Sequence, residues 1–208
     1  MTCQSNKFMS KDDLLKLIAD TAYNVGFGAK KHMATFDIVV KVPGLIRFFS
    51  VTIGIYSLIF DSLSSKFLSA SLLVLGVVSL YISFYNSQKE EYEVAGVELI
   101  QLFNELKKLY YRTKQADEEA LPELSERLKD IEDKYYQQSI SKQILFSDWY
   151  CHYKFFWQYQ IDWVDEQKHF KLFRDKIPLS FSATLLCLLI VLICWIFLPV
   201  ANNDLLSL

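Results

Sequence analysis

FFSVTIGIYSLIFDSLSSKFLSASLLVLGVVSLYISF, residues 48–84, decides the fold of this 208-residue chain. It consists of two apolar runs joined by the short segment 61–66. A bilayer core is roughly 30 Å thick and is crossed by about 20 residues of helix, so we predict spans at about 48–60 and 67–85. Together they form a transmembrane hairpin within residues 37–87. The alternative is a pair of buried core helices in a soluble bundle, because runs this short fit either setting.

A third apolar run, residues 177–201, contains no charged residue. It predicts a third, C-terminal transmembrane helix, followed by a tail at 202–208. Before the hairpin, Pro43-Gly44 predicts a break between an interfacial approach and the first membrane helix. Arg47 then lies at the membrane surface, where its long side chain reaches the headgroups. The expected fold class is therefore an all-α membrane protein.

The distribution of Lys and Arg predicts the orientation of these spans. Residues 1–47 carry seven Lys or Arg against four Asp or Glu, whereas segment 61–66 carries one of each. Four further cations, Lys168, Lys171, Arg174 and Lys176, precede the third run. Because positive residues stay in the cytoplasm, we expect the N-terminus and residues 88–176 on the cytoplasmic side. Met1 to Ser10 is polar and does not resemble a signal peptide.

The region between the second and third spans begins with two helical patterns. Residues 88–145 contain two apolar stripes at helical spacing. The first consists of Leu99, Leu102, Leu106 and Leu109, and the second of Leu121, Leu124, Leu128, Ile131 and Tyr135. The stripes predict a cytoplasmic helical hairpin that follows an N-terminal helix at 1–36. They form either the core of this hairpin or an interface between subunits.

Residues 146–176 are rich in aromatic side chains and contain three of the four tryptophans. Aromatic rings with one polar edge favour the headgroup layer. We therefore predict an amphipathic helix along the inner membrane surface, with Trp149, Trp157 and Trp163 at the interface. The alternative is an aromatic core packed against the helical hairpin.

Small and polar residues follow one face of each helix of the membrane hairpin. They are Ser50, Gly54, Ser57 and Asp61 in the first, and Ser69, Gly76, Ser79 and Ser83 in the second. Such residues let helices approach closely, so packing between helices is one interpretation. The other is that their hydroxyls line a water-filled path in an oligomer.

No pattern of catalytic residues is present in the sequence. The four cysteines and three histidines do not form a zinc-binding pattern, and no phosphate-binding glycine loop or nucleophile elbow occurs. The acidic pairs fit solvated helix faces. We therefore expect no enzyme, no metal and no cofactor.

One cluster has the composition of a nucleotide-binding surface. It consists of Lys107, Lys108, Tyr110, Tyr111, Arg112 and Lys114. Cations beside aromatic rings bind nucleic acids by charge and stacking. The alternative is an ordinary basic helix end near anionic lipid, which the net acidic character of residues 88–176 favours.

The order of these parts resembles a known family. The lead-in GAKKHMATFDIVVKVPGLIRFF (28–49), the helix VELIQLFNELKKLYYR (97–112) and the helix LPELSERLKDIEDKYYQQS (121–139) surround the tight two-span hairpin. Over about residues 12–165 the chain resembles the SLATT family of bacterial two-span effector domains. The third apolar run is a departure from the simplest family pattern.

The resemblance implies a function that the residues alone do not give. It implies an oligomeric effector of the bacterial inner membrane, which opens a pore and acts in antiphage defence by abortive infection. Its partners would be membrane lipid, further copies of itself and a nucleotide or oligonucleotide regulator made by a nucleotidyltransferase. The alternative is a membrane adaptor without a channel, which recruits a cytoplasmic partner through its helical hairpin.

Overall fold

The computed structural model of the protein describes the backbone of residues 10–63 and 65–205. Side chains are described as far as Cys194, apart from those of residues 62 and 64, so the end of the predicted third span and the predicted tail lie largely outside the description. The elements in this part are all helical. They are α1 (Lys11–Tyr56), α2 (Lys66–Ser83), α3 (Lys89–Gln115), α4 (Leu121–Gln138), α5 (Ser147–Phe156), α6 (Asp162–Lys168) and α7 (Leu179–Leu205), with 3₁₀ turns at Asp61–Leu63, Asn86–Gln88 and Glu118–Ala120. The predicted all-α membrane fold is confirmed.

The chain forms two units, one ending at His169 and the other beginning at Phe170. The first holds α1 to α6. The second holds a π-helical turn, Leu172–Lys176, and α7. The described apolar part of α7, Leu179–Cys194, is shorter than the two other candidate spans. A third span therefore stays a prediction.

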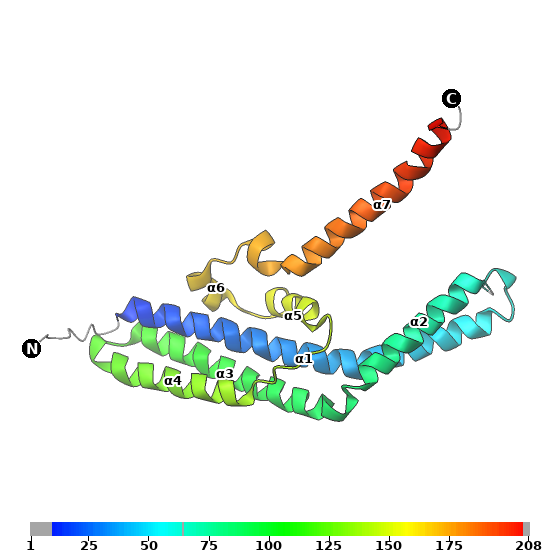
Figure 1. Cartoon of the computed structure of the whole chain (residues 1–208). Helices are drawn as coiled ribbons and strands as arrows, with labels where there is room; N and C mark the ends of the chain where they lie inside the picture. The colour runs from blue at the N-terminus through cyan, green and yellow to red at the C-terminus, as the bar shows by residue number, and fades with distance from the viewer. Residues whose placement is uncertain (1–9, 64, 206–208) are drawn as a thin grey trace, which may run out of the picture. The chain divides into compact units, whose positions relative to one another are not determined.

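Helix α1 is a single helix of 46 residues. It begins at the N-cap Ser10, whose hydroxyl accepts a hydrogen bond from the amide of Asp13. It continues through Pro43, so the predicted break at Pro43-Gly44 is wrong. A proline removes one helical hydrogen bond, but both halves of α1 are held by packing, the first against α3 and the second against α2 (Figure 1).

The first half of α1 packs with α3 and α4 in a bundle (Figure 1). The four leucines of the first predicted stripe are buried, and so are Leu121, Leu124, Leu128 and Ile131 of the second. Both stripes therefore form a core within one chain, and the alternative of a subunit interface does not apply to these residues. Two glycines allow α1 and α3 to approach each other closely. A Cβ on Gly26 would lie 2.7 Å from the ring of Phe103, and one on Gly96 would lie 2.7 Å from Sδ of Met33.

Helices α5 and α6 cover the bundle with aromatic side chains. Phe155 is buried, with its ring centroid 5.7 Å from that of Tyr23. Trp163 contacts the rings of Phe103 and Tyr110, each at 5.3 Å. Ion pairs join α5 and α6 to α1 and α3. They are Lys168 with Asp20, Lys114 with Glu166, Lys31 with Asp148 and Lys154 with Asp37.

The predicted single amphipathic helix over 146–176 is therefore wrong. The segment is divided into α5, α6 and the π-helical turn, and residues in the left-handed region, Phe146 (φ 66°) and His169 (φ 51°), interrupt it. Trp163 is only 4% exposed, so its predicted interfacial position is also wrong. Trp157 is 64% exposed and Trp149 is half-buried, so their interfacial role stays a prediction.

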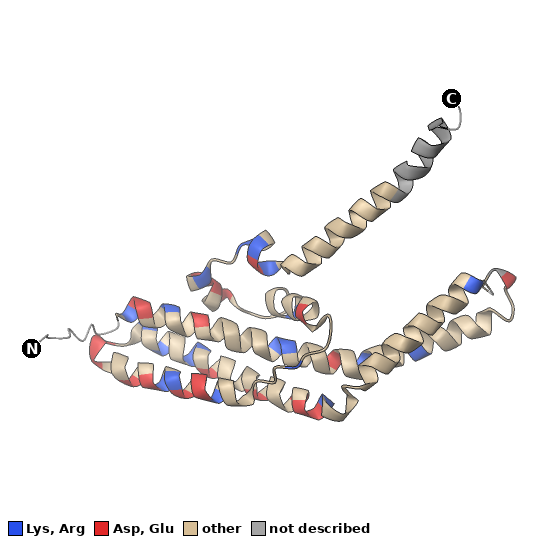
Figure 2. Ribbon diagram, in the orientation of Figure 1, with Lys and Arg blue, Asp and Glu red and all other residues tan. Residues whose placement is uncertain are grey.

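The second half of α1 and α2 form an apolar hairpin, and both helices are long and apolar enough to cross a membrane. Figure 2 shows charged residues spread over the bundle and few on the hairpin. The apolar side chains here are exposed, as with Phe48 at 64% and Leu73 at 74%. A core helix of a soluble protein buries such residues, so the alternative of a soluble bundle fails for this hairpin.

The close approach at Gly26 gives a first prediction. In Gly26→Ala the added Cβ meets the rings of Phe103 and Phe155, at 2.7 and 2.9 Å. We expect this overpacking to cost about 1–3 kcal/mol of unfolding free energy. Thermal unfolding of the full chain in detergent measures it.

Gly44→Ala is the matched control in the same helix, because nothing lies within 4 Å of a Cβ at Gly44. This variant is expected to keep or raise the stability of the wild type, since alanine favours a helix. Equal losses in the two variants would contradict the close packing of α1 on α3 and α5.

Candidate functional site at the base of the membrane hairpin

The hairpin and the bundle meet at an apolar cluster. Its buried members are Val39, Ile82, Tyr85, Tyr92 and Ile144, with Phe36, Ile38, Val42 and Ile140 packed against them. Ile140 and Ile144 belong to residues 139–146, which connect α4 to α5 and are not helical. We call this connection the linker, and the cluster together with the linker the junction. The junction thus brings α1, the end of α2, the start of α3 and the linker to one place.

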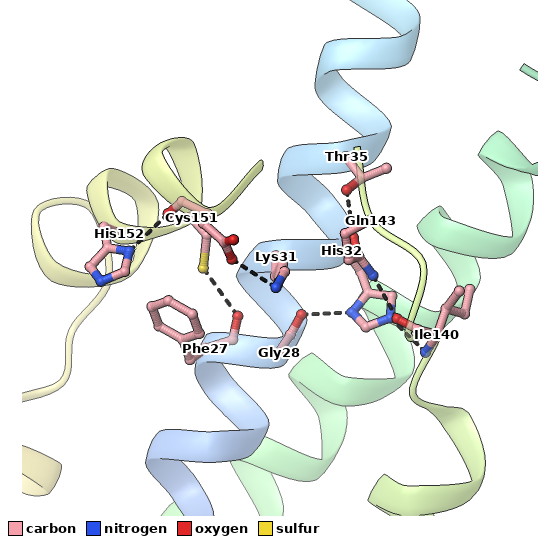
Figure 3. A network of polar contacts seen from close by, with 10 residues as sticks. Phe27, Gly28, Lys31, His32, Thr35, Ile140, Gln143, Cys151 and His152 are labelled. Atoms are coloured by element: carbon pink, nitrogen blue, oxygen red, sulfur yellow. Dashed lines mark hydrogen bonds and ion pairs between the residues drawn. The ribbon is translucent and has the colours of Figure 1, made fainter. Parts of the chain in front are cut away.

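His32 of α1 holds the linker from inside the bundle. The ring is 3% exposed, with Nδ1 2.7 Å from the carbonyl oxygen of Gly28. The amide of Ile140 donates to Nε2 at 3.0 Å (Figure 3). A carbonyl oxygen can only accept, so Nδ1 carries the hydrogen and the ring is neutral. Burial lowers the pKa of His32 below its ordinary value of 6.5, and the charge of Lys31 adds to the effect, against the Gly28 hydrogen bond, which raises the pKa.

Other hydrogen bonds hold further polar groups of the linker. Thr35 donates to Oε1 of Gln143 at 2.5 Å, and Nε2 of Gln143 donates to the carbonyl of Ile140 at 2.8 Å. The hydroxyl of Tyr92 donates to the carbonyl of Lys142 at 2.6 Å. Buried backbone groups need such partners where no helix or sheet supplies them. The linker is therefore fixed by side chains of α1 and α3.

Charged residues attach α5 beside the same part of α1. Asp37 pairs with Lys154 of α5 and, at 2.6 Å, with Lys41. Burial alone would raise the pKa of Asp37, but the hydrogen bonds and charges of the two lysines lower it below 3.8. Cys151 donates from Sγ to the carbonyl of Phe27 at 3.2 Å, and burial raises the pKa of its thiol (Figure 3). A thiol with a raised pKa is a packing group and a poor nucleophile.

The small-residue faces of the hairpin are only partly covered by the rest of the described chain. Ser50, Gly54, Ser57 and Ser79 are half-buried, whereas Asp61, Ser69, Gly76 and Ser83 are exposed. No atom lies within 4 Å of a Cβ built on Gly54 or on Gly76, so neither glycine serves close packing within the hairpin. The hydroxyls of Ser57, Ser69 and Ser83 donate to carbonyls of their own helix, at 2.8, 3.2 and 2.7 Å. The roles of these eight residues stay predictions.

The predicted nucleotide cluster is not assembled as one surface. Tyr110 is buried, its ring contacts Trp163, and its hydroxyl accepts from Nε2 of Gln167 at 3.0 Å. The prediction that a base stacks on Tyr110 is therefore wrong. Lys114 is paired with Glu166 at 2.6 Å. Lys108, Tyr111, Arg112 and the paired Lys114 are exposed, and Lys107 is half-buried.

Metal chemistry has no site in the described part of the chain, where no group of three or more His, Cys, Asp or Glu is arranged to hold an ion. The sequence also gave no signal for His32, Asp37 or Gln143. Each has one partner more than 100 residues away along the chain, and no local motif reveals that contact.

Comparison with known families matches residues 9–185 to the family described as SMODS and SLOG-associating 2TM effector domain 6. The chain belongs to this SLATT family. The resemblance in the sequence is thereby confirmed, and the matched region holds α1 to α6 and the start of α7. Comparisons with curated proteins and with solved structures found no match.

Membership in the SLATT family fixes the general role of the protein. It is a membrane effector of nucleotide-signalling defence systems, and the two transmembrane segments in the family description agree with α1 and α2. SLATT domains associate with SMODS nucleotidyltransferase partners. Residues after 185, including most of α7, lie beyond the match.

The neutral state of His32 gives a second prediction, on pH. The folded pKa lies below the unfolded value of 6.5, so the unfolded chain binds more protons as the pH falls below 6.5. Stability from His32 is thus complete above about pH 6.5 and is lost as the pH falls toward the lowered pKa. Between about pH 7.5 and 5.5 we expect a loss of roughly 1 kcal/mol, measured by unfolding in detergent.

His32→Gln removes the titrating group and is expected to flatten this part of the pH dependence. His152→Gln is the control, because His152 is half-buried, packs on Phe27 and does not bind the linker. A His32→Gln variant with the full wild-type pH dependence would refute the neutral imidazole.

Proposed function

We propose that the protein assembles through its membrane hairpin into an oligomer that opens a pore in the bacterial inner membrane when triggered. Pore opening would stop an infected cell and so act in antiphage defence by abortive infection. The N-terminus and the bundle lie in the cytoplasm in this proposal. Family membership supports the effector role, and the following observation supports the assembly.

The open glycines of the hairpin carry the proposal. Gly54 and Gly76 have no atom within 4 Å of an added Cβ, although each lies in an apolar helix. In a membrane, small residues are used where another helix approaches closely. Since no described helix of the unit that holds α1 to α6 does so here, a second copy is the occupant that fits. Ser50, Ser57, Ser69 and Ser79 would then lie near the contact, where their hydroxyls can face a water path.

The tip of the hairpin gives such a path a polar mouth. Asp61 and Lys66 are exposed and flank the turn between α1 and α2. Between Arg47 and Asp61 and within the rest of α2 the sequence has no charged residue. A path lined by hydroxyls without charges favours a simple pore over an ion-coupled transporter.

The bundle is the part that would receive the trigger. A nucleotide or oligonucleotide from a partner nucleotidyltransferase, or that enzyme itself, would meet the exposed cations of α3, Lys108 and Arg112, with Tyr111 between them. The junction then passes a change in the bundle to the hairpin, because the linker touches both. The third apolar helix, α7, would anchor the chain beside the assembly.

A third prediction tests the pore in planar bilayers. The purified full chain is expected to give discrete conductance steps and a cross-linking ladder of more than two subunits. In Gly54→Ile with Gly76→Ile the bulky side chains block close approach, so conductance should fall roughly tenfold or more.

The control variant is Val51→Ile with Val74→Ile. These residues lie in the same two helices and are exposed, so they tolerate one more methylene toward lipid. It should conduct as the wild type does. Inserted wild-type protein that leaves the bilayer ion-tight under every trigger would contradict the pore and favour the adaptor.

A further inference from the structure

A pocket of about 430 Å³ lies at the base of the hairpin, on a side of α1 walled by the end of α2 and the start of α3. Its polar lining comes from four elements. Arg47 belongs to α1, Ser79 and Ser83 to α2, Asn86 to the 3₁₀ turn and Lys89 to α3. The pocket therefore exists only because the hairpin and the bundle are fixed to each other at the junction.

The charge of this pocket is positive. Arg47 and Lys89 line it, and its other lining residues are neutral. The neighbouring carboxylates Glu90 and Glu91 line a separate groove toward α4, together with Glu98. The positive and negative side chains at the start of α3 thus line two different pockets. The basic pocket is suited to an anion.

The arginine keeps donors for such an anion. Its Nε donates to the carbonyl of Pro43 at 3.3 Å, which fixes the side chain along α1. A guanidinium has five N–H donors, and this bond uses one of them. Ser83 already donates to its own helix, so the donors for a phosphate are Arg47 and Lys89 with the hydroxyl of Ser79 and the amide of Asn86.

The depth of the pocket decides between lipid and soluble phosphate. It lies where α2 ends, between the exposed apolar side chains of the hairpin and the charged bundle. Bilayer headgroups occupy this depth. Its lining includes the apolar Val40 and Pro43 and no aromatic ring, so a nucleotide base would have nothing on which to stack.

We infer that this pocket binds the phosphate of an anionic phospholipid from the leaflet on the side of the bundle. The bound lipid bridges α1, α2 and α3 at the junction and so stabilises one arrangement of hairpin and bundle. The site requires the membrane setting of the hairpin. It does not require the pore.

Native mass spectrometry of the full chain in neutral detergent tests the site, with phosphatidylglycerol and phosphatidylcholine as probes. The wild type should retain one phosphatidylglycerol per chain in preference to phosphatidylcholine. Arg47→Gln with Lys89→Gln removes both cations and should weaken retention roughly tenfold or more. Arg47→Lys with Lys89→Arg keeps both charges and should retain the lipid, with thermal unfolding confirming that each variant is folded.

Lys108→Gln with Arg112→Gln is the matched control, because it removes one lysine and one arginine from the exposed face of α3. It should retain the lipid as the wild type does. Equal retention of the two lipids, or equal loss in both glutamine variants, would overturn the proposal. Displacement of the lipid by millimolar ATP or inorganic phosphate would overturn the lipid as the source of the phosphate.

Discussion

The structure depends on one continuous helix, α1, whose first half lies in the bundle and whose second half lies in the membrane hairpin. Helix α1 supplies the centre of the bundle with its first half and one wall of the membrane hairpin with its second half. Water and lipid make opposite demands on side chains but the same demand on the backbone, whose hydrogen bonds a helix satisfies within itself. The helix therefore continues through Pro43 at the cost of one hydrogen bond. A change in the packing of α3 or α5 on the first half acts on a rod whose other half lies among lipids.

The junction explains how the remaining elements follow that rod. The linker is not held by regular secondary structure. Instead His32, Thr35 and Tyr92 bind linker groups that are far away in sequence. Side-chain hydrogen bonds of this kind are directional and are lost singly, so the joint is more easily altered than a continuous helix. In the proposed mechanism this is where a signal received by the bundle reaches the hairpin.

Much of this fold could be predicted from the sequence, because long apolar runs and leucines at helical spacing each have one physical cause, the burial of apolar side chains away from water. Two apolar runs with a tight connection gave the hairpin, and leucines at helical spacing gave α3 and α4. The errors occurred where one residue type satisfies two environments. Trp163 and Tyr110 carry an apolar body with a polar edge, which suits both a headgroup layer and a buried aromatic core. Proline disfavours the interior of a helix, which predicts a break at Pro43. Packing on α3 before it and on α2 after it keeps α1 continuous.

The candidate site was the least predictable part. His32 is one of three histidines scattered along the sequence. Its structural role depends on a hydrogen bond from a backbone amide 108 residues later in the chain. Likewise the basic pocket is made of residues from four elements, of which Ser79 and Ser83 had been placed in a stripe of small residues. Such sites arise from the tertiary structure and leave no spacing rule in the sequence.

The most direct test of the account is the continuity of α1 in a membrane. Spin labels at Asn24 and Val51, both exposed positions of α1, are introduced into the reconstituted full chain with Cys3, Cys187 and Cys194 replaced. Pulsed electron–electron double resonance should give one narrow distance distribution at roughly 40 Å, because a helix rises 1.5 Å per residue. A broad or clearly shorter distribution would show a break at Pro43-Gly44 and contradict the rod that joins bundle and hairpin.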